Sequence, residues 1–122
     1  MAKKCGRQLK VLQLWHGTGK TDPRVIIKSE SGLNINYAND GLWGKGIYFA
    51  VNANYSCPTY SYPFTGLSSV YEVLVCEVII GESTNYVPYD RSIKAPPINS
   101  ESKQPYDSIK GNSEGSDIYV VY

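Results

Sequence analysis

The amino-acid sequence predicts a single domain of the α+β class in which β-strands dominate. Several segments alternate in the two-residue period of a strand, whereas only one short stretch carries helix-type capping residues. Two long polar stretches separate the apolar segments. With 122 residues, 42% of them hydrophobic, the chain has the size of one domain with its own core. We therefore treat residues 1–122 as a single domain, since no linker divides them.

Four segments have the composition of strands: Leu9–His16, Gly46–Ala50, Val70–Ile80 and Asp117–Tyr122. The first alternates apolar side chains on one face, as a half-buried strand does. The third is long, rich in β-branched residues and apolar on both faces, which is typical of a strand covered on both sides. We expect Val70–Ile80 at the centre of the sheet.

One short helix is expected between residues 21 and 32. Thr21 or Asp22 can cap its start, Pro23 suits the first helical position, and Gly32 can close its end.

The remaining long stretches, 34–43 and 86–115, are predicted to be loops. They are rich in Asn, Ser, Pro and Gly, and the prolines at 96, 97 and 105 argue against a buried helix in the second. Loops of this length in a compact domain are more often functional than idle.

Composition narrows the classes of partner and site. The formal net charge of +1 provides no overall field toward nucleic acid or an anionic membrane. The early apolar run, residues 11–15, is too short for a signal peptide or a membrane span. The three cysteines have no paired C-x-x-C spacing and the chain has one histidine, so we expect no metal site. We expect the cysteines to be reduced thiols and the protein to be intracellular, either cytoplasmic or nuclear.

His16, the only histidine, ends the first predicted strand in the sequence LWHGTG. A lone histidine is usually a structural residue that is hydrogen-bonded to the backbone. Here its position favours a second interpretation, because the ring and the exposed backbone of Gly17 face the same open space. One small ligand could contact both.

The run GLWGKGIYFAVNANYS, residues 41–56, could bind a phosphate, form a turn or carry a tyrosine into a site. Its glycines match neither the P-loop nor the dinucleotide-binding pattern, so a turn that leads into a strand is favoured. In that strand Ile47 and Phe49 point one way and Tyr48 the other. If the first face is core, Tyr48 faces a cleft.

Covalent hydrolysis is disfavoured. No serine lies in a G-x-S-x-G motif, and Cys57 precedes Pro58 with no histidine nearby in the sequence. The residues alone therefore indicate a small-ligand site built from His16, Gly17, Tyr48 and loop residues.

Three ordered motifs resemble one family: HGTG at 16–19, GKGIYFAVNANYS at 44–56, and YDSIKGNSEGSDIYVVY at 106–122. They resemble the catalytic domain of the poly(ADP-ribose) polymerase-like, diphtheria-toxin-like ADP-ribosyltransferases, and most closely the mono-transferring members. The resemblance covers residues 12–122. It implies a split antiparallel sheet with short helices, a cleft that binds NAD⁺ as a substrate, no metal, and a protein acceptor.

The resemblance also assigns roles to residues. It implies that His16 bonds a ribose hydroxyl of NAD⁺, that the Gly17 backbone holds the nicotinamide carboxamide, and that Tyr48 packs on the nicotinamide ring. Ser56 matches best the serine that bonds the carboxamide. Tyr60 matches best the second tyrosine that stacks on the nicotinamide ring, with Tyr55 and Tyr62 as alternatives. The resemblance also places Thr18, Phe49 and Ala50 among the residues that bind NAD⁺.

The third signature position decides the type of transfer. Polymerising members carry a glutamate where this chain has Ile118. Isoleucine cannot accept a hydrogen bond, and a hydrogen bond to a charged group is worth roughly 1.5–3 kcal/mol. The resemblance thus implies mono-ADP-ribosylation. Strand alternation turns Asp117 away from the face that Ile118 uses. With no enzyme carboxylate at the third position, an acceptor that is already ionised, such as Asp or Glu, is favoured.

Two departures from the family pattern support a different interpretation. Family domains usually carry a strand and a helix before the histidine motif and a closing strand after the Y-V-V-Y segment, and we expect both to be missing here. Together with Ile118, these departures keep open a catalytically inactive module that binds NAD⁺ or ADP-ribose.

Overall fold

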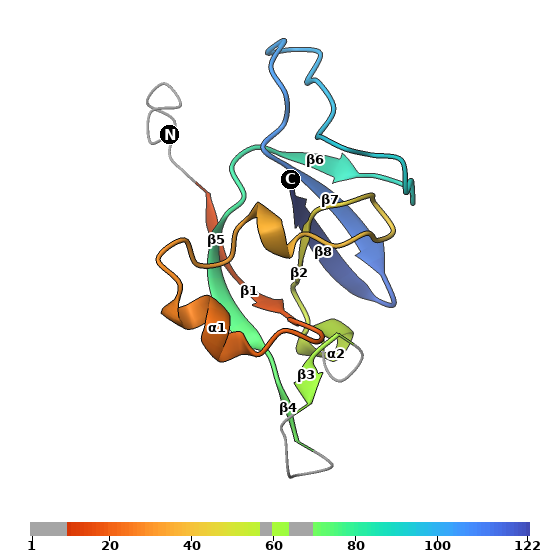
Figure 1. The fold of residues 1–122 in the computed structure, drawn as a ribbon. Coiled ribbons are helices and arrows are strands. Elements are labelled where there is room, and N and C mark those ends of the chain that lie inside the picture. Colours follow the sequence, from red (N-terminus) through yellow and green to blue (C-terminus); the bar gives the residue numbers. More distant parts are fainter. Residues whose placement is uncertain (1–9, 57–59, 64–69) are drawn as a thin grey trace.

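A computed structural model describes residues 10–56, 60–63 and 70–122 of the chain. Strands dominate and the helices are short, which confirms the predicted fold class (Figure 1). The strands are β1 (Val11–His16), β2 (Ile47–Ala50), β3 (Tyr62–Pro63), β4 (Tyr71–Glu72), β5 (Leu74–Ile79), β6 (Ser83–Tyr86), β7 (Ser108–Ser113) and β8 (Ser116–Val121). The helices are α1 (Pro23–Lys28), the 3₁₀ turn η2 (Ile35–Tyr37) and α2 (Ala53–Ser56).

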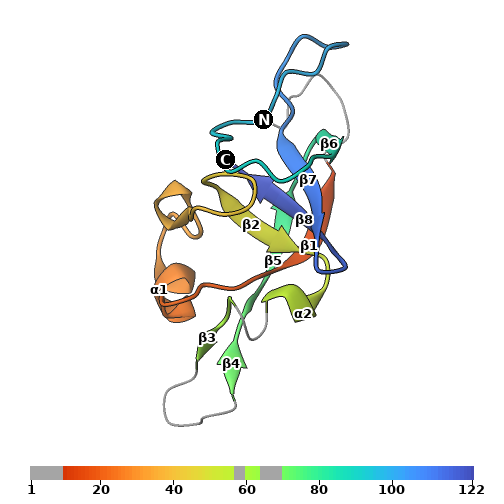
Figure 2. The same ribbon diagram turned by 90° about the vertical axis from the view of Figure 1, so that its right-hand side faces the viewer.

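Within the described residues, the main sheet has six strands in the order β5-β1-β2-β8-β7-β6, and β3 pairs with β4 in a separate ribbon. All pairs in the main sheet are antiparallel except β6 with β7, which run parallel. The sheet is therefore mixed, whereas the family resemblance in the sequence predicted an antiparallel sheet. The β3-β4 ribbon and the long segment between β6 and β7 project from opposite ends of the molecule (Figures 1 and 2).

The sheet divides between β1 and β2. β1 pairs with β5 along its whole length, and β2 pairs with β8 along its whole length. In contrast, β1 and β2 share a single register pair, Trp15 with Ala50. This pair lies next to His16, the last residue of β1.

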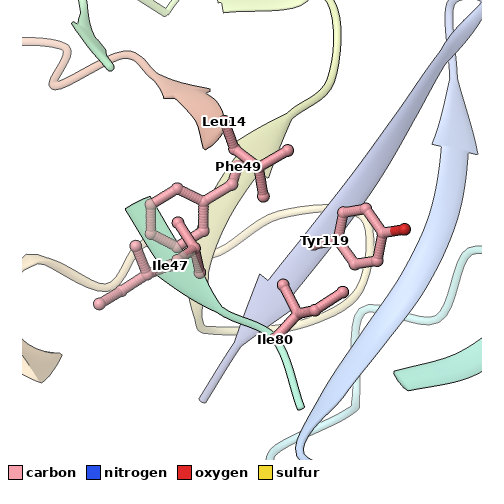
Figure 3. Packing of buried hydrophobic residues seen from close by; sticks show 6 residues of the cluster. Leu14, Ile47, Phe49, Ile80 and Tyr119 are labelled. Carbon is pink, nitrogen blue, oxygen red and sulfur yellow. The ribbon is translucent and has the colours of Figure 1, made fainter. Parts of the chain in front are cut away.

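A hydrophobic cluster on one side of the sheet joins the two halves. Leu14 of β1, Phe49 of β2 and Tyr119 of β8 are buried in it, together with Ile80, which follows β5 (Figure 3). Ile47 belongs to the same cluster, so the alternation along β2 is as predicted. Burial of such side chains stabilises the fold by roughly 1.5–3 kcal/mol each.

A second cluster contains Trp43, Ala50, Ile109, Ile118 and Val120. Its centre is Trp43, which comes from the segment before β2 and is fully buried. A Cβ added to Gly111 of β7 would lie 2.1 Å from the indole ring, so only glycine allows this close approach.

The strand predictions were correct for β1, β2 and β8 but wrong in two places. The segment Val70–Ile80 contains β4 and β5, and β5 is an edge strand of the main sheet rather than its centre. Val75 and Ile79 are 51% and 59% exposed, so that face of β5 is not covered by any element that the structure describes. The predicted loop 86–115 contains β7, which pairs with β8 over residues 109–113.

Helix α1 begins as predicted and ends earlier than predicted. Asp22 caps it by accepting a hydrogen bond from the Arg24 backbone N–H at 3.0 Å, and Pro23 takes the first helical position. Ser29 ends the helix, whereas Gly32, with φ of 58°, lies in the turn that follows. In the part of the chain that the structure describes, no helix is long and apolar enough to cross a membrane.

Candidate functional site

A pocket of about 470 Å³ lies where the sheet divides, a volume typical of small-ligand sites. Its walls come from the end of β1, the segment before β2, helix α2, the segment after β6 and the β7-β8 turn. The lining residues are His16, Gly17, Asn39, Asp40, Gly41, Leu42, Gly46, Tyr48, Tyr55, Ser56, Tyr60, Tyr89, Arg91, Ser113 and Glu114.

His16 holds the two halves of the sheet together at the pocket. Its side chain is 5% exposed, and Nδ1 lies 2.7 Å from the carbonyl oxygen of Tyr48 on β2. Because a carbonyl can only accept, Nδ1 must carry the proton, which leaves Nε2 as an acceptor in the neutral ring. Burial lowers the pKa of His16, and the bond to Tyr48 partly opposes this. The pocket thus contains a neutral imidazole that can accept from a ligand hydroxyl.

The lowered pKa of His16 predicts a loss of stability at acidic pH. The folded protein binds fewer protons at this site than the unfolded chain, so the stability is present above the unfolded pKa of about 6.5 and is lost as pH falls through the folded value. We expect the melting temperature to fall more steeply in the wild type than in His16→Gln between about pH 7.5 and about pH 5. Equal slopes in both proteins would contradict this assignment.

Gly17 permits a close approach between the segment after β1 and the segment after α2. A Cβ at this position would lie 2.3 Å from the carbonyl oxygen of Tyr60. The same oxygen accepts a hydrogen bond from the Gly19 N–H at 2.8 Å. Any side chain at residue 17 would therefore displace Tyr60, and the bare backbone of Gly17 remains accessible in the pocket.

Tyr48 is fixed by its hydroxyl group. The hydroxyl accepts a hydrogen bond from the Trp43 N–H at 2.9 Å and donates one to the Gly44 carbonyl at 2.6 Å. A Cβ on Gly41 would lie 2.6 Å from the Tyr48 ring, so this segment packs closely on it. Burial is the main cause that raises the pKa of Tyr48. Its ring, rather than its hydroxyl, is what a ligand can contact.

Tyr55 and Tyr60 form an aromatic wall. Their ring centroids are 5.0 Å apart at an interplanar angle of 30°, a separation at which aromatic pairs attract. Both line the pocket, as does the buried Ser56 at the end of α2. Tyr62, on β3, does not line it.

Four sequence-predicted site residues do not line this pocket. Phe49 and Ala50 are buried in the two hydrophobic clusters, and the Phe49 ring lies 5.4 Å from the His16 ring, which it supports. Thr18 donates a hydrogen bond to the Thr21 carbonyl at 2.6 Å.

The fourth, Ile118, is 0% exposed and packs with Trp43. It therefore makes no contact with the space that His16 and Tyr48 share.

A second hollow of about 390 Å³ adjoins the pocket. The two share His16, Gly17, Asn39 and Tyr60, and the second extends along residues 18–21. A ligand could therefore place one part in each hollow, with the connection between the two parts lying beside the end of β1.

Sequence reasoning missed the pocket residues Asn39, Asp40, Tyr89 and Arg91. They come from the two long polar stretches, 34–43 and 86–115. The length of these stretches predicted functional loops, but no pattern in them indicated which residues would line a pocket. The segment 39–46 is held by a bridge between Asn39 and Gly46 and by the bond from the Asp90 N–H to the Leu42 carbonyl at 2.8 Å.

Among the described residues, no group of three or more His, Cys, Asp or Glu side chains could hold a metal ion. The pocket instead combines a neutral histidine, a tyrosine pair and exposed backbone. This set suits an organic ligand with a flat ring and hydroxyl groups.

The divided sheet, with a histidine at the end of one strand and a tyrosine on the next, is the arrangement that the resemblance to ADP-ribosyltransferases implied. Residues 2–122 match the family described as the poly(ADP-ribose) polymerase catalytic domain. The chain belongs to this family, which uses NAD⁺ as a substrate and modifies protein acceptors.

Three relatives agree with this assignment. A probable poly(ADP-ribose) polymerase of Dictyostelium discoideum is 34% identical over 88% of this chain and 28% of its own length. The human protein mono-ADP-ribosyltransferase PARP14 is 36% identical over 100% of this chain and 7% of its own length. The mouse protein mono-ADP-ribosyltransferase PARP3 is 34% identical over 73% of this chain and 16% of its own length. The chain thus spans less than a third of each relative.

Proposed function

We propose that this domain is a mono-ADP-ribosyltransferase that transfers ADP-ribose from NAD⁺ to a protein acceptor and releases nicotinamide. The observation that carries the proposal is the buried, neutral His16, with its acceptor nitrogen available at the split in the sheet. The family match and the two mono-transferring relatives support it.

The pocket fits the nicotinamide half of NAD⁺. The Gly17 backbone and Ser56 offer hydrogen bonds to a carboxamide, and Nε2 of His16 can accept from a ribose hydroxyl. Tyr48 and Tyr60 offer aromatic surfaces for the nicotinamide ring. The adjoining hollow along residues 18–21 offers room for the ADP half.

The reaction breaks the bond between C1′ of the ribose and the nicotinamide nitrogen. The electron pair leaves with nicotinamide, whose positive charge it neutralises, and an acceptor then forms a new bond to C1′. Holding both partners in place lowers the barrier by reducing the entropy lost on reaction. The chain has Ile118 where polymerising members carry a glutamate, and two relatives are mono-transferring enzymes, so we propose that the domain adds one ADP-ribose unit and does not extend a chain.

Nicotinamide release tests this function. We expect the wild type to release nicotinamide from NAD⁺ and His16→Ala to lose most of that release, because the variant lacks the acceptor at the ribose. Val25→Ala, an exposed position on α1 outside the pocket, serves as the control and should keep wild-type release. A wild type that binds NAD⁺ without releasing nicotinamide would contradict the proposal.

The same experiment covers a second function, a catalytically inactive module that binds NAD⁺ or ADP-ribose. The burial of Ile118 favours it, since the third signature position presents no polar group to the pocket. Such a module predicts an NAD⁺-dependent rise in melting temperature that His16→Ala loses, with no nicotinamide released by either protein.

A further inference from the structure

The turn between β7 and β8 brings a carboxylate to the pocket. Ser113 pairs with Ser116, so Glu114 and Gly115 form a two-residue hairpin loop. Ser113 and Glu114 both line the pocket that contains His16. Glu114 thus lies on the same hairpin as Ile118, but at its exposed tip rather than in its buried strand.

The geometry of the turn does not explain a glutamate here. Glu114 and Gly115 have φ of 51° and 81°, and hairpin loops with two positive φ values favour Asn or Asp followed by Gly. Gly115 satisfies this preference and Glu114 does not. A residue that breaks a local rule is expected at functional sites, where the side chain has another role.

The surroundings of Glu114 leave its carboxylate available. Within residues 10–56, 60–63 and 70–122, the side chain is exposed and enters no hydrogen bond or ion pair with another described residue. Its charge reaches the aromatic wall. Burial and the neighbouring Tyr60 raise the pKa of Tyr55, and the charge of Glu114 adds to this effect. Asp40 and Arg91 are the other charged residues that line the pocket.

We propose that Glu114 is the catalytic base of the transfer reaction, in place of the carboxylate that residue 118 does not provide. The proposal rests on the proposed function. The acceptor's oxygen or nitrogen forms a bond to C1′ of the ribose while the bond from C1′ to nicotinamide breaks. Nicotinamide leaves neutral with the electron pair, and the proton of the acceptor passes to the Glu114 carboxylate and then to solvent.

This role specifies the acceptor class. An acceptor with an O–H or N–H group, such as a serine hydroxyl or an arginine side chain, must lose a proton as it attacks. An ionised Asp or Glu needs no base, so the Glu114 carboxylate would have no proton to take from such an acceptor. The structure thus favours hydroxyl or nitrogen acceptors over the ionised acceptor that the sequence suggested.

Hydrolysis of NAD⁺ tests the base without a known protein acceptor, because water is itself an O–H acceptor. We expect Glu114→Gln to lower hydrolysis about 100-fold or more, which is the range of general base catalysis, with NAD⁺ binding unchanged. Glu101→Gln, an exposed glutamate outside the pocket, is the matched control and should hydrolyse NAD⁺ like the wild type. Azide, an anionic nucleophile without a proton, should restore nicotinamide release in Glu114→Gln by forming the azide of ADP-ribose.

The outcomes separate the two proposals. If the wild type does not consume NAD⁺, the proposed function fails and the role of Glu114 fails with it. If the wild type is active and Glu114→Gln hydrolyses NAD⁺ equally well, the base assignment alone is wrong. If Glu114→Gln binds NAD⁺ but loses hydrolysis and azide does not restore nicotinamide release, the base assignment is also wrong. Glu114 would then hold NAD⁺ in position rather than accept the proton of the acceptor.

Discussion

Ile118→Glu is expected to destabilise the fold and not to create a polymerase. Ile118 is 0% exposed and packs against Trp43 and Ala50, so the new carboxylate would be buried among apolar side chains without a partner. Loss of the buried isoleucine and burial of an uncompensated polar group together cost about 4 kcal/mol or more. Urea denaturation of the purified variant measures this loss.

Ile118→Leu is the matched control for this prediction, since swaps between hydrophobic side chains of similar volume usually cost less than about 1.5 kcal/mol. The destabilisation of Ile118→Glu should also shrink at acidic pH, where the buried carboxyl can be neutral. An Ile118→Glu protein as stable as the wild type, or one that builds chains of ADP-ribose, would show that residue 118 reaches the pocket.

Trp43→Ala should have the second large effect, on both stability and ligand binding. Trp43 is fully buried, its Nε1–H donates to the Val87 carbonyl at 2.8 Å, and its carbonyl accepts from the Tyr122 hydroxyl at 2.6 Å. It therefore links the segment before β2 to the segment after β6 and to the end of β8. Truncation of a buried tryptophan costs about 3–5 kcal/mol.

The same change should weaken NAD⁺ binding, because the buried indole holds in place the segment whose residue 43 backbone N–H donates to the Tyr48 hydroxyl at 2.9 Å. Thermal denaturation with and without NAD⁺ measures both effects. Trp43→Phe retains an aromatic ring in the core and should lose much less stability. A Trp43→Ala protein with wild-type stability and a full NAD⁺-dependent shift in melting temperature would exclude this role.

The sequence predicted those elements whose periodicity reflects burial on one face. In β2, Ile47 and Phe49 enter the first cluster while Tyr48 reaches the pocket, as the alternation indicated. The prediction for β5 failed because an apolar strand can lie at an edge with one face uncovered, as Val75 and Ile79 do. The same residues would be equally compatible with a central strand, so only the pairing with neighbouring strands determines whether β5 lies at the edge or in the centre of the sheet.

Strand β7 shows what local sequence does not contain. Its sequence SIKGNS is polar and lacks a strand pattern. Pairing with β8 and the packing of Trp43 on Gly111 make it a strand, and both are tertiary effects. Trp43 was placed in a predicted loop for the same reason, although it is the largest fully buried side chain among the described residues.

The site was predictable where motifs named its residues. His16 and Gly17 come from the first motif and Tyr48 and Ser56 from the second, while Tyr60 follows the second. The structure brings all five to one pocket. Tyr89 and Arg91 lie on a segment without periodicity, and only the three-dimensional fold places them at the pocket.

The intact mass of the chain and of a mixed protein lysate after incubation with NAD⁺ tests the central claim most directly. Mono-transfer predicts additions of single ADP-ribose units to proteins in the incubation, and the absence of these additions with His16→Ala. A ladder of repeated units on one acceptor site would contradict mono-transfer. No addition to any protein, with NAD⁺ binding intact, would contradict transfer itself.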